Sequence, residues 1–409
     1  MIPLPLEELR GLGVLDGEGE ATGLTINSRD AGPGDLFVAV RGGRAFVAQA
    51  RAQGAATLVP DDEHAALAAI GRALRARSQA RVVGITGSTG KTSTKDILGA
   101  LCAPVTRTVA TRASENAELG VPLTLGRLKP DTELCIVELG MRGLGQIAEL
   151  CAIARPDLAV ITAIGPVHLE LVGSIDGVAR SKAELVAALP AGGIAVVPRA
   201  PELEPYLQRD EIEVRRVGKV DVELRDDGAH VAFGRDRIRF PLTSRHQAQN
   251  ALTALTAYDA LGLPLDRVQE AADRVELSRW RGEELALAGG GVAINDAYNA
   301  NPSSMRAALE HLAERGTGRK LAVLGGMAEL GEHAERYHRE IGALADELGI
   351  EVIAVGDLAR AYGAATWVPD GSAAVAAVRE RLLPGDAVLV KASRALALEG
   401  VAPALANGL

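Results

Sequence analysis

Short apolar runs alternate with longer amphipathic stretches through the middle of the chain. The apolar runs predict strands. The stretches between them repeat their apolar positions at the spacing of a helix face, as in residues 145–154 and 174–189. This alternation is typical of a parallel sheet covered by helices. The predicted strands of this block are residues 82–85, 134–139, 158–164 and 194–197.

The same alternation begins again after the three glycines at 289–291. Between the two alternating blocks the pattern changes to short strands rich in charge and Gly at 213–242, which predict a small β insertion. Helices are predicted after it, at 250–261 and 265–275. The predicted strands of the last block are residues 292–295, 321–324, 351–355 and 387–391.

The beginning of the chain forms a block of its own. Short strands there are interrupted by Gly32, Pro33 and Gly34, and a helix rich in Ala and Arg ends the block near Ser78. A chain of 409 residues is too long for one ordinary core. We therefore predict an α/β protein of three domains, residues 1–79, 80–282 and 283–409.

A glycine-rich turn follows the first strand of the middle block and leads into a helix. In such a turn the backbone N–H groups and the helix dipole converge on one point, which favours phosphate. Lys91 can reach the outer phosphates of a nucleotide, and the Thr92 hydroxyl can hold magnesium. The strict phosphate-loop pattern has Gly where Ile85 stands, so this is a variant. The predicted nucleotide contacts are Gly87, Ser88, Thr89, Gly90, Lys91, Thr92 and Ser93.

Polar residues follow several of the predicted strands. Ligands of open parallel sheets bind outside the carboxyl ends of the strands. Glu138, His168, Asp296 and Lys391 all fall at such ends. A carboxylate near a phosphate loop can help to hold magnesium. The alternative is a capping or solvated Glu138 and a hydrogen-bonded structural His168.

Three further segments allow either a structural or a chemical interpretation. By spacing alone Lys182 is a surface lysine of an amphipathic helix, paired with a neighbouring Glu. Residues 296–305, DAYNANPSSM, suit a turn and a helix start, or a set of side-chain amides facing a ligand. Lys391, Ser393 and Arg394 stand at a strand-to-helix turn and form a candidate anion site.

Composition narrows the classes of protein. The formal charge is −9 and aromatic residues are 3%, so no nucleic-acid partner is expected. The first residues lack a basic segment followed by an apolar one, and no apolar run approaches ~18 residues, so no membrane span is expected. Cys102, Cys135 and Cys151 are odd in number and fit reduced core positions. These features predict a cytoplasmic protein.

Taken together and in chain order, the segments resemble the Mur ligase family. The resemblance covers nearly the whole chain. Its most specific part is YNANP followed by M-x-ELG and LVK-x-SR, which separates one kind of member from the others. The matching motifs are SRDAGPGDLFVAV, TGSTGKTS, LGVPLTL, VELGMRGLGQIAELCAIARPD, ITAIGPVHLELVGS, ARSKAEL, RHQAQNALTAL, NDAYNANPSSM, LGGMAELGEH and VLVKASRALALE.

The resemblance implies a fold and a reaction. The fold has a UDP-substrate domain, a central ATPase domain with a phosphate loop on a parallel sheet, and a C-terminal domain of dinucleotide-fold topology. In the reaction ATP phosphorylates the terminal carboxylate of UDP-N-acetylmuramoyl-tripeptide. The amine of D-alanyl-D-alanine then attacks the acyl phosphate, which makes a peptidoglycan precursor. We expect ATP and Mg²⁺ as cofactors, and a monomer.

The resemblance also implies roles for single residues. Glu138 and His168 serve the metal sites with Thr92, and Lys182 matches a lysine that carries a carbamate. At ~4 Å and an effective dielectric near 20, an ammonium facing Mg²⁺ is repelled by roughly 8 kcal/mol, and a carbamate reverses the sign. The implied ATP contacts include Asn250, Arg281 and Asp296. The implied substrate contacts are Ser28, Arg29, Asn116, Asn299, Asn301, Lys391, Ser393 and Arg394.

Three positions depart from the family pattern. An Asp-Gly-His element near Arg41–Phe46 is shortened to RGGRAF, paired asparagines are reduced to Asn116-Ala117, and Gly326 replaces an Asp. Alternatives therefore stay open. They are another amino-acid-adding ligase of the family or a folylpolyglutamate synthase, a P-loop ATPase that drives motion, and a nucleotide-binding relative without catalysis.

Overall fold

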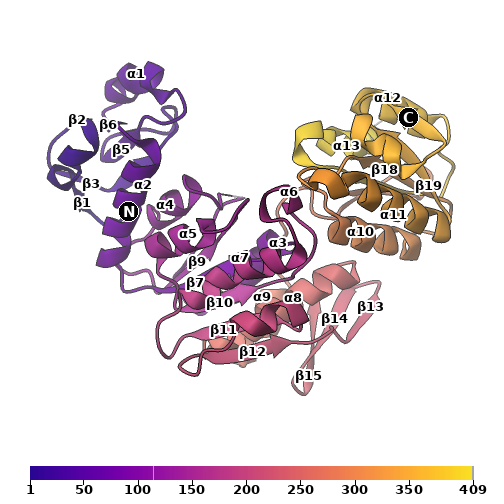
Figure 1. Cartoon of the computed structure of the whole chain (residues 1–409), viewed down its shortest axis with the longest axis horizontal. Coiled ribbons are helices and arrows are strands. Elements are labelled where there is room, and N and C mark those ends of the chain that lie inside the picture. Colours follow the sequence, from indigo (N-terminus) through magenta and orange to yellow (C-terminus); the bar gives the residue numbers. More distant parts are fainter. Residues whose placement is uncertain (114, 408–409) are drawn as a thin grey trace.

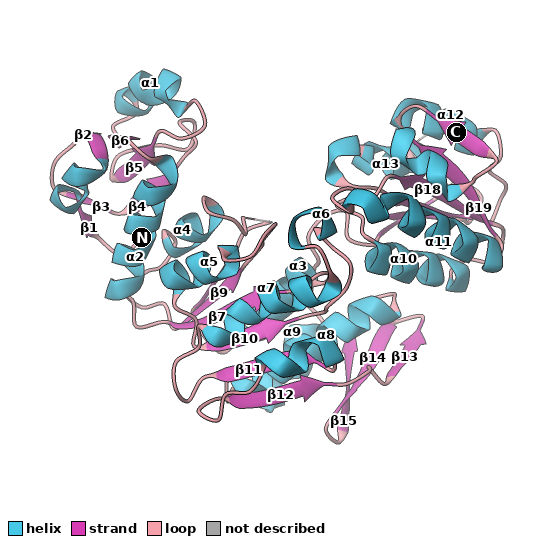
Figure 2. Cartoon of the chain, in the orientation of Figure 1, coloured by secondary structure: helices cyan, strands magenta, loops and turns pink. Residues whose placement is uncertain are grey.

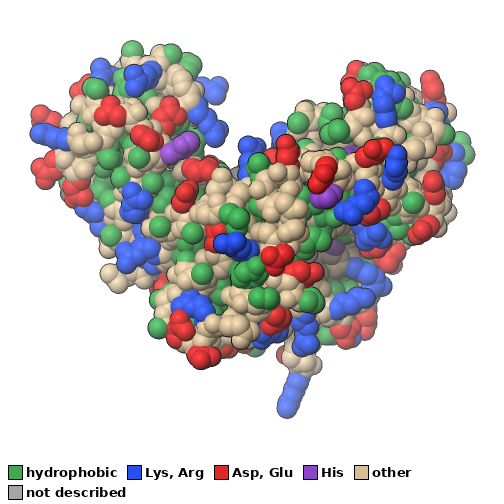
Figure 3. Space-filling model, in the orientation of Figure 1, with side chains coloured by type: hydrophobic (Ala, Val, Ile, Leu, Met, Phe, Trp, Pro, Cys, Tyr) green, Lys and Arg blue, Asp and Glu red, His purple; other side chains and the backbone are tan. Residues whose placement is uncertain are grey.

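Three lobes, each built around its own sheet, make up this computed structural model (Figure 1). It describes residues 1–113 and 115–407. We name the first lobe (1–79), the central lobe (80–282) and the C-terminal lobe (283–407) by the predicted limits. The first and C-terminal lobes stand on opposite sides of the central lobe, and Figure 3 shows a notch between them. Helices cover the sheets (Figure 2), which confirms the α/β prediction.

The central lobe holds a six-stranded parallel sheet in the order β12-β11-β10-β7-β9-β8. The strands are β7 (Arg81–Thr86), β8 (Thr108–Ala110), β9 (Leu134–Glu138), β10 (Leu158–Ile161), β11 (Ile194–Pro198) and β12 (Glu213–Val217). The inner strands β7, β9, β10 and β11 are largely buried, as their continuous apolar sequences require, whereas the edge strands β8 and β12 are partly exposed. The helices are α3 (Lys91–Cys102), α4 (Gly120–Leu125), α5 (Gln146–Ala154), α6 (Leu169–Val172), α7 (Ile175–Ala187), α8 (Arg245–Ala260) and α9 (Val268–Ala272).

Three local predictions for this lobe are wrong. β12 pairs in parallel with β11 instead of joining the small insertion, because an edge strand tolerates its charged Arg215 and Arg216. The helix predicted at 265–275 divides into a 3₁₀ turn and the short α9. β10 ends at Ile161 because Thr162 turns to the glycine loop, where its hydroxyl donates to the Thr89 carbonyl. The insertion is an antiparallel sheet of β13 (Val222–Arg225), β14 (Gly228–Phe233) and β15 (Asp236–Phe240).

The C-terminal lobe is a second six-stranded sheet, in the order β16-β17-β21-β18-β19-β20. Only β16 runs antiparallel to its neighbour. The run β20-β19-β18-β21 has the 3-2-1-4 order of a dinucleotide fold, as predicted. The strands are β16 (Glu283–Ala286), β17 (Val292–Asn295), β18 (Lys320–Gly325), β19 (Ile350–Val355), β20 (Thr366–Val368) and β21 (Ala387–Lys391). The helices are α10 (Pro302–Glu314), α11 (Ala334–Glu347), α12 (Gly371–Arg379) and α13 (Val401–Ala406).

The first lobe is joined to the central lobe by a shared core. Its helix α2 begins after Asp62, whose carboxylate accepts from the Ala65 N–H at 2.9 Å. One cluster of buried side chains runs from Ile70 and Leu74 of α2 to Leu125 of α4. The elements of this lobe are β1 (Leu4–Pro5), β2 (Gly13–Asp16), β3 (Glu20–Ala21), β4 (Gly23–Thr25), β5 (Asp35–Val38), β6 (Ala56–Pro60), α1 (Val47–Ala52) and α2 (Glu63–Arg77).

The fold bears on two predictions, the core positions of the cysteines and the lack of a membrane span. All three cysteines are buried, which confirms their predicted core positions, and none of them forms a disulfide. Burial raises the pKa of Cys102, Cys135 and Cys151 to about 12, so their thiols stay protonated. In residues 1–113 and 115–407 no helix is long and apolar enough to cross a bilayer.

The shared core predicts that shortening a buried side chain of α2 lowers the stability of the protein. Ile70→Ala should lower the free energy of unfolding by about 2–5 kcal/mol, because it opens a cavity between the two lobes. Arg72→Ala on the exposed face of the same helix should change it by less than about 0.5 kcal/mol. Urea unfolding followed by circular dichroism measures both. Equal effects of the two substitutions would contradict a core that spans the lobes.

Candidate functional site

The glycine loop between β7 and α3 is fixed by close packing. Gly90 adopts φ 78°, and a Cβ there would lie 2.2 Å from Asn250 Oδ1. Gly87 adopts φ 149°, and a Cβ there would lie 2.0 Å from Thr162 Oγ1. Both positions therefore require glycine. The loop is held against β10 and α8 before any ligand binds.

Four side chains lie close together where α3 begins and β9 ends. The Lys91 ammonium donates to the Gly87 carbonyl at 2.8 Å, so it folds back over the loop. The Thr92 hydroxyl donates to Glu138 Oε1 at 3.2 Å, and the Asn116 amide donates to the same oxygen at 2.8 Å. Burial lowers the pKa of Lys91, and Glu138 opposes that shift. The predicted phosphate and metal residues are therefore neighbours.

Glu138 leaves an oxygen available for a cation. Its Oε2 is buried and has no hydrogen-bond partner among the described residues. Such an orphaned carboxylate oxygen beside the Thr92 hydroxyl fits Mg²⁺, which prefers oxygen ligands. In the described parts of the chain no group of three or more His, Cys, Asp or Glu side chains forms a metal cage.

His168 stands after β10, at the carboxyl edge of the sheet. Its backbone is left-handed, at φ 53°, and it immediately precedes α6. Its Nδ1 is hydrogen-bonded to Oε2 of Glu329, which belongs to the C-terminal lobe. Burial lowers the pKa of His168, while Glu329 acts in the opposite direction. A residue of the central lobe is thus held by a residue of another lobe.

Lys182 is buried on α7, with 1% of its surface exposed. The alternative of a surface lysine is therefore wrong. The neighbouring Glu184 does not pair with it but accepts from the Gly145 and Ala148 N–H groups, at 2.7 and 3.0 Å. The Lys182 ammonium has no hydrogen bond or ion pair within the described residues. The pKa of Lys182 lies well below its usual range. Burial is the larger cause, and the charge of Lys91 is the second.

The C-terminal lobe presents the loop 296–301 to the glycine loop. Lys391 is buried and pairs with Asp296 at 2.6 Å, and it donates to the Asn299 carbonyl at 2.9 Å. Asn301 caps α10 by accepting from the Ser304 N–H, which confirms the predicted helix start. The Asn301 amide also donates to the Ser88 carbonyl at 3.4 Å. The cap of a C-terminal helix therefore touches the central phosphate loop.

Two arginines border the passage between these lobes. Arg281 donates to Thr92 Oγ1 at 2.7 Å and lies 4.0 Å over the Tyr298 ring. Arg394 lies 4.7 Å from the Trp280 ring and pairs with Glu399 at 2.9 Å. Both guanidinium groups are held by aromatic faces at the point where the chain crosses from one lobe to the next.

These residues surround one cavity of about 810 Å³. All three lobes contribute to its wall, the first through Arg41. Of the predicted site residues, Gly87, Lys182, Ser28 and Arg29 do not line it. Those that do are Ser88, Thr89, Gly90, Lys91, Thr92, Ser93, Asn116, Glu138, His168, Asn250, Arg281, Asp296, Asn299, Asn301, Lys391, Ser393 and Arg394.

Several residues that the sequence analysis did not single out also line the cavity. They include Arg142, His246 and Glu329. Burial lowers the pKa of His246 to about 4, so its ring is neutral at pH 7. All three stand in motifs that carry the family resemblance, Glu329 as the Glu of M-x-ELG, but the sequence analysis assigned no role to any of them.

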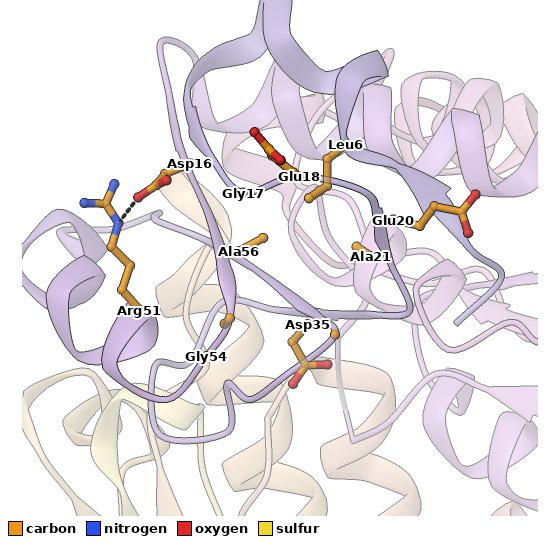
Figure 4. Close-up of a pocket in the computed structure, with 12 residues that line it drawn as sticks. Leu6, Asp16, Gly17, Glu18, Glu20, Ala21, Asp35, Arg51, Gly54 and Ala56 are labelled. Atoms are coloured by element: carbon orange, nitrogen blue, oxygen red, sulfur yellow. Dashed lines mark ion pairs between the residues drawn. The ribbon is translucent and has the colours of Figure 1, made fainter.

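A second hollow, of about 400 Å³, lies in the first lobe (Figure 4). Four carboxylates are among the residues that line it, and the single Arg51 is paired with Asp16 at 2.7 Å. A wall of this charge repels anions. The phosphate-bearing ligands suggested by the glycine loop therefore belong to the larger cavity.

Comparison with known proteins agrees with this geometry. Residues 85–258 match the Mur ligase middle domain, and residues 280–394 match the Mur ligase glutamate ligase domain. A UDP-N-acetylmuramoyl-tripeptide–D-alanyl-D-alanine ligase of Synechocystis sp. is 34% identical, over 92% of this chain and 90% of that protein.

Solved structures show the same fold along the whole chain. A crystal structure of MurF from Acinetobacter baumannii has a TM-score of 0.86 at 29% identity and covers 99% of both chains. The MurF ligase of Thermotoga maritima, solved in complex with ADP, has a TM-score of 0.83 at 27% identity, over 94% of this chain and 97% of that one. The similarity therefore includes all three lobes.

The packing of the glycine loop predicts a steric effect on nucleotide binding. Gly90→Ala should weaken ADP binding at least ~10-fold, because a left-handed non-glycine residue costs about 1–2 kcal/mol and its Cβ would collide with Asn250. Gly99→Ala on the same helix is the matched control. Its Cβ would meet only Ala110, at 3.8 Å, so ADP affinity should not change. Titration calorimetry measures both, and equal affinities would exclude this loop as the binding element.

Proposed function

Because this chain belongs to the Mur ligase family, we propose that it is an ATP-dependent ligase that joins D-alanyl-D-alanine to UDP-N-acetylmuramoyl-tripeptide. These are the substrates in the names of its relatives. The observation that carries the proposal is the position of Glu138 beside the phosphate loop, in a cavity that the C-terminal lobe also lines. A ligase of this kind needs ATP, the carboxylate of the tripeptide and the amine of D-alanyl-D-alanine in one enclosed space.

The phosphate loop supplies the electrostatic part of the reaction. The N–H groups of residues 87–92 and the ammonium of Lys91 would hold the ATP phosphates. Mg²⁺ would be held by Thr92, Glu138 and the phosphates, with His168 nearby, and would neutralise charge on the transferred phosphoryl group. Arg281 is placed to add a second positive charge. These groups favour attack by a carboxylate oxygen on the terminal phosphorus.

The two chemical steps balance without further reactants. The terminal carboxylate of the tripeptide forms a bond to the γ-phosphorus, and the bond to ADP breaks. The amine of D-alanyl-D-alanine then attacks the acyl carbon, loses its proton and releases phosphate. The loop 296–301 of the C-terminal lobe contacts the phosphate loop through Asn301, and closer approach of the two lobes would help to exclude water from the acyl phosphate.

We also propose that Lys182 carries a carbamate. Its buried amine has no partner among the described residues, and its lowered pKa favours the neutral form that attacks CO₂. The nitrogen bonds to the carbon of CO₂ and its proton passes to solvent. The resulting anion would offset Lys91 and turn a repulsive neighbour of Mg²⁺ into an attractive one.

Two further features of the proposal concern the setting of the enzyme. We propose a cytoplasmic location, supported by three reduced cysteines in the core and by a nucleotide-linked substrate. We also propose that the enzyme is a monomer. The residues near Ser28 and Arg29 would hold the UDP part of the substrate, at a distance from the phosphate loop.

The proposed reaction predicts which mixtures release phosphate. Phosphate should be released from ATP in quantity only when UDP-N-acetylmuramoyl-tripeptide and D-alanyl-D-alanine are both present, together with an equal amount of ligated product by mass spectrometry. Release that does not depend on the dipeptide would instead indicate an ATPase that drives motion. Use of glutamate as the amine would indicate a folylpolyglutamate synthase.

The carbamate predicts a chemical rescue. Lys182→Ala should reduce turnover by at least ~100-fold, because a charge that stabilises the transition state is lost. Formate or acetate should restore part of it by occupying the vacated space. The matched control is Lys219→Ala, which removes an exposed lysine and should leave turnover unchanged. Normal turnover of Lys182→Ala without any additive would exclude the proposed role.

A further inference from the structure

Glu329, a residue of the C-terminal lobe, contacts the candidate metal ligand His168 of the central lobe. We propose that Glu329 is a positioning residue that fixes the tautomer and the direction of the His168 ring, so that Nε2 is directed to the cavity. The inference rests on the proposed function, because it assumes that His168 serves the magnesium site. It adds a residue to that site and explains how the C-terminal lobe takes part in it.

The contact between the two side chains is specific. Oε2 of Glu329 is hydrogen-bonded to His168 Nδ1, and Oε1 of Glu329 lies 3.4 Å from the Arg142 Nε. Both carboxylate oxygens therefore have a partner, and the closer one is the His168 ring. The Nε2 atom of His168 makes no hydrogen bond to any described residue, and the ring lines the cavity. One nitrogen is thus held and the other is left for a ligand.

The chemistry of the pair determines which nitrogen carries the proton. An ionised carboxylate only accepts hydrogen bonds, so Nδ1 must be the donor. In a neutral ring the lone pair then lies on Nε2, which is the form that binds a metal ion. Carboxylates that hold metal-binding histidines in this way are common in proteins and raise the basicity of the ligand. Glu329 has the position and the charge for this role.

The backbone around His168 is attached to the C-terminal lobe as well. Val167 and Leu169, on either side of it, are buried in one cluster with Met327 and Leu330. The Glu170 N–H donates to the Glu329 carbonyl at 3.4 Å. His168 and Glu329 both have left-handed backbones, at φ 53° and 62°, which cost free energy unless the surroundings hold them. The C-terminal lobe therefore holds His168 by its backbone and by its ring.

The tautomer of His168 gives a test that does not depend on activity. Long-range ¹H–¹⁵N correlation spectra of the full chain at about pH 8 distinguish a protonated Nδ1 from a protonated Nε2. The His168 signals are assigned by their loss in His168→Gln. The wild type should show the proton on Nδ1. Glu329→Ala should move it toward Nε2, whereas Glu329→Gln should retain it on Nδ1, because the amide oxygen still accepts.

Metal binding gives the second readout. Mn²⁺ is titrated by electron paramagnetic resonance in the presence of ADP. Glu329→Ala should weaken Mn²⁺ binding by about 10- to 100-fold, and Glu329→Gln should lose less. Glu332→Gln is the matched control, since this glutamate of the same turn is exposed and has no ion pair in the described residues. It should bind Mn²⁺ like the wild type.

The outcomes separate this inference from the proposed function. A wild-type ring protonated on Nε2, or Mn²⁺ binding that is unchanged or tighter in Glu329→Ala, would overturn the positioning role. Tighter binding would mean that Glu329 competes with the metal ion for His168. If both readouts follow the expectation but no ligated product forms, the positioning role stands and only the proposed reaction fails.

Discussion

The closeness of two lysines at the cavity determines much of this site. Lys182 is buried and Lys91 is partly buried, Lys91 helps to lower the pKa of Lys182, and Glu138 is the carboxylate whose charge acts on Lys91. This repulsion favours the neutral form of Lys182, and an anion placed between the two side chains would offset it. The whole protein has a formal net charge of −9, yet the lysines at this cavity favour phosphate and carboxylate groups. We interpret the site as preorganised for ligands that carry negative charge.

The order of the strands explains why these groups meet. β7 lies between β9 and β10, so the loops after all three strands open at the same edge of the sheet. They carry the phosphate loop, Glu138 and His168. The C-terminal lobe then adds contacts that no single lobe could make, from Asn301 to Ser88 and from Glu329 to His168. The site is therefore built by contacts between lobes as well as within the central lobe.

Features that depend on neighbouring residues could be predicted from the sequence, whereas contacts between distant parts of the chain could not. The phosphate loop and the Asn301 cap depend on neighbouring residues, so motif and spacing identified both. Helical spacing alone placed Lys182 at the surface, because a periodic pattern cannot show that a polar face packs against a site. The charged strand β12 was assigned to the wrong sheet for a similar reason. Glu329 and His168 are 161 positions apart, and only the folded chain shows that they touch.

The central claim is that one cavity brings the terminal phosphate of ATP against a carboxylate of the acceptor. Isotope transfer tests this most directly. The terminal carboxylate of UDP-N-acetylmuramoyl-tripeptide is labelled with ¹⁸O and turned over with ATP and D-alanyl-D-alanine, and the released phosphate is analysed by mass spectrometry. Passage through an acyl phosphate predicts one ¹⁸O atom in each phosphate released. Phosphate without label would contradict the account, because water or another group would then have taken the phosphoryl group.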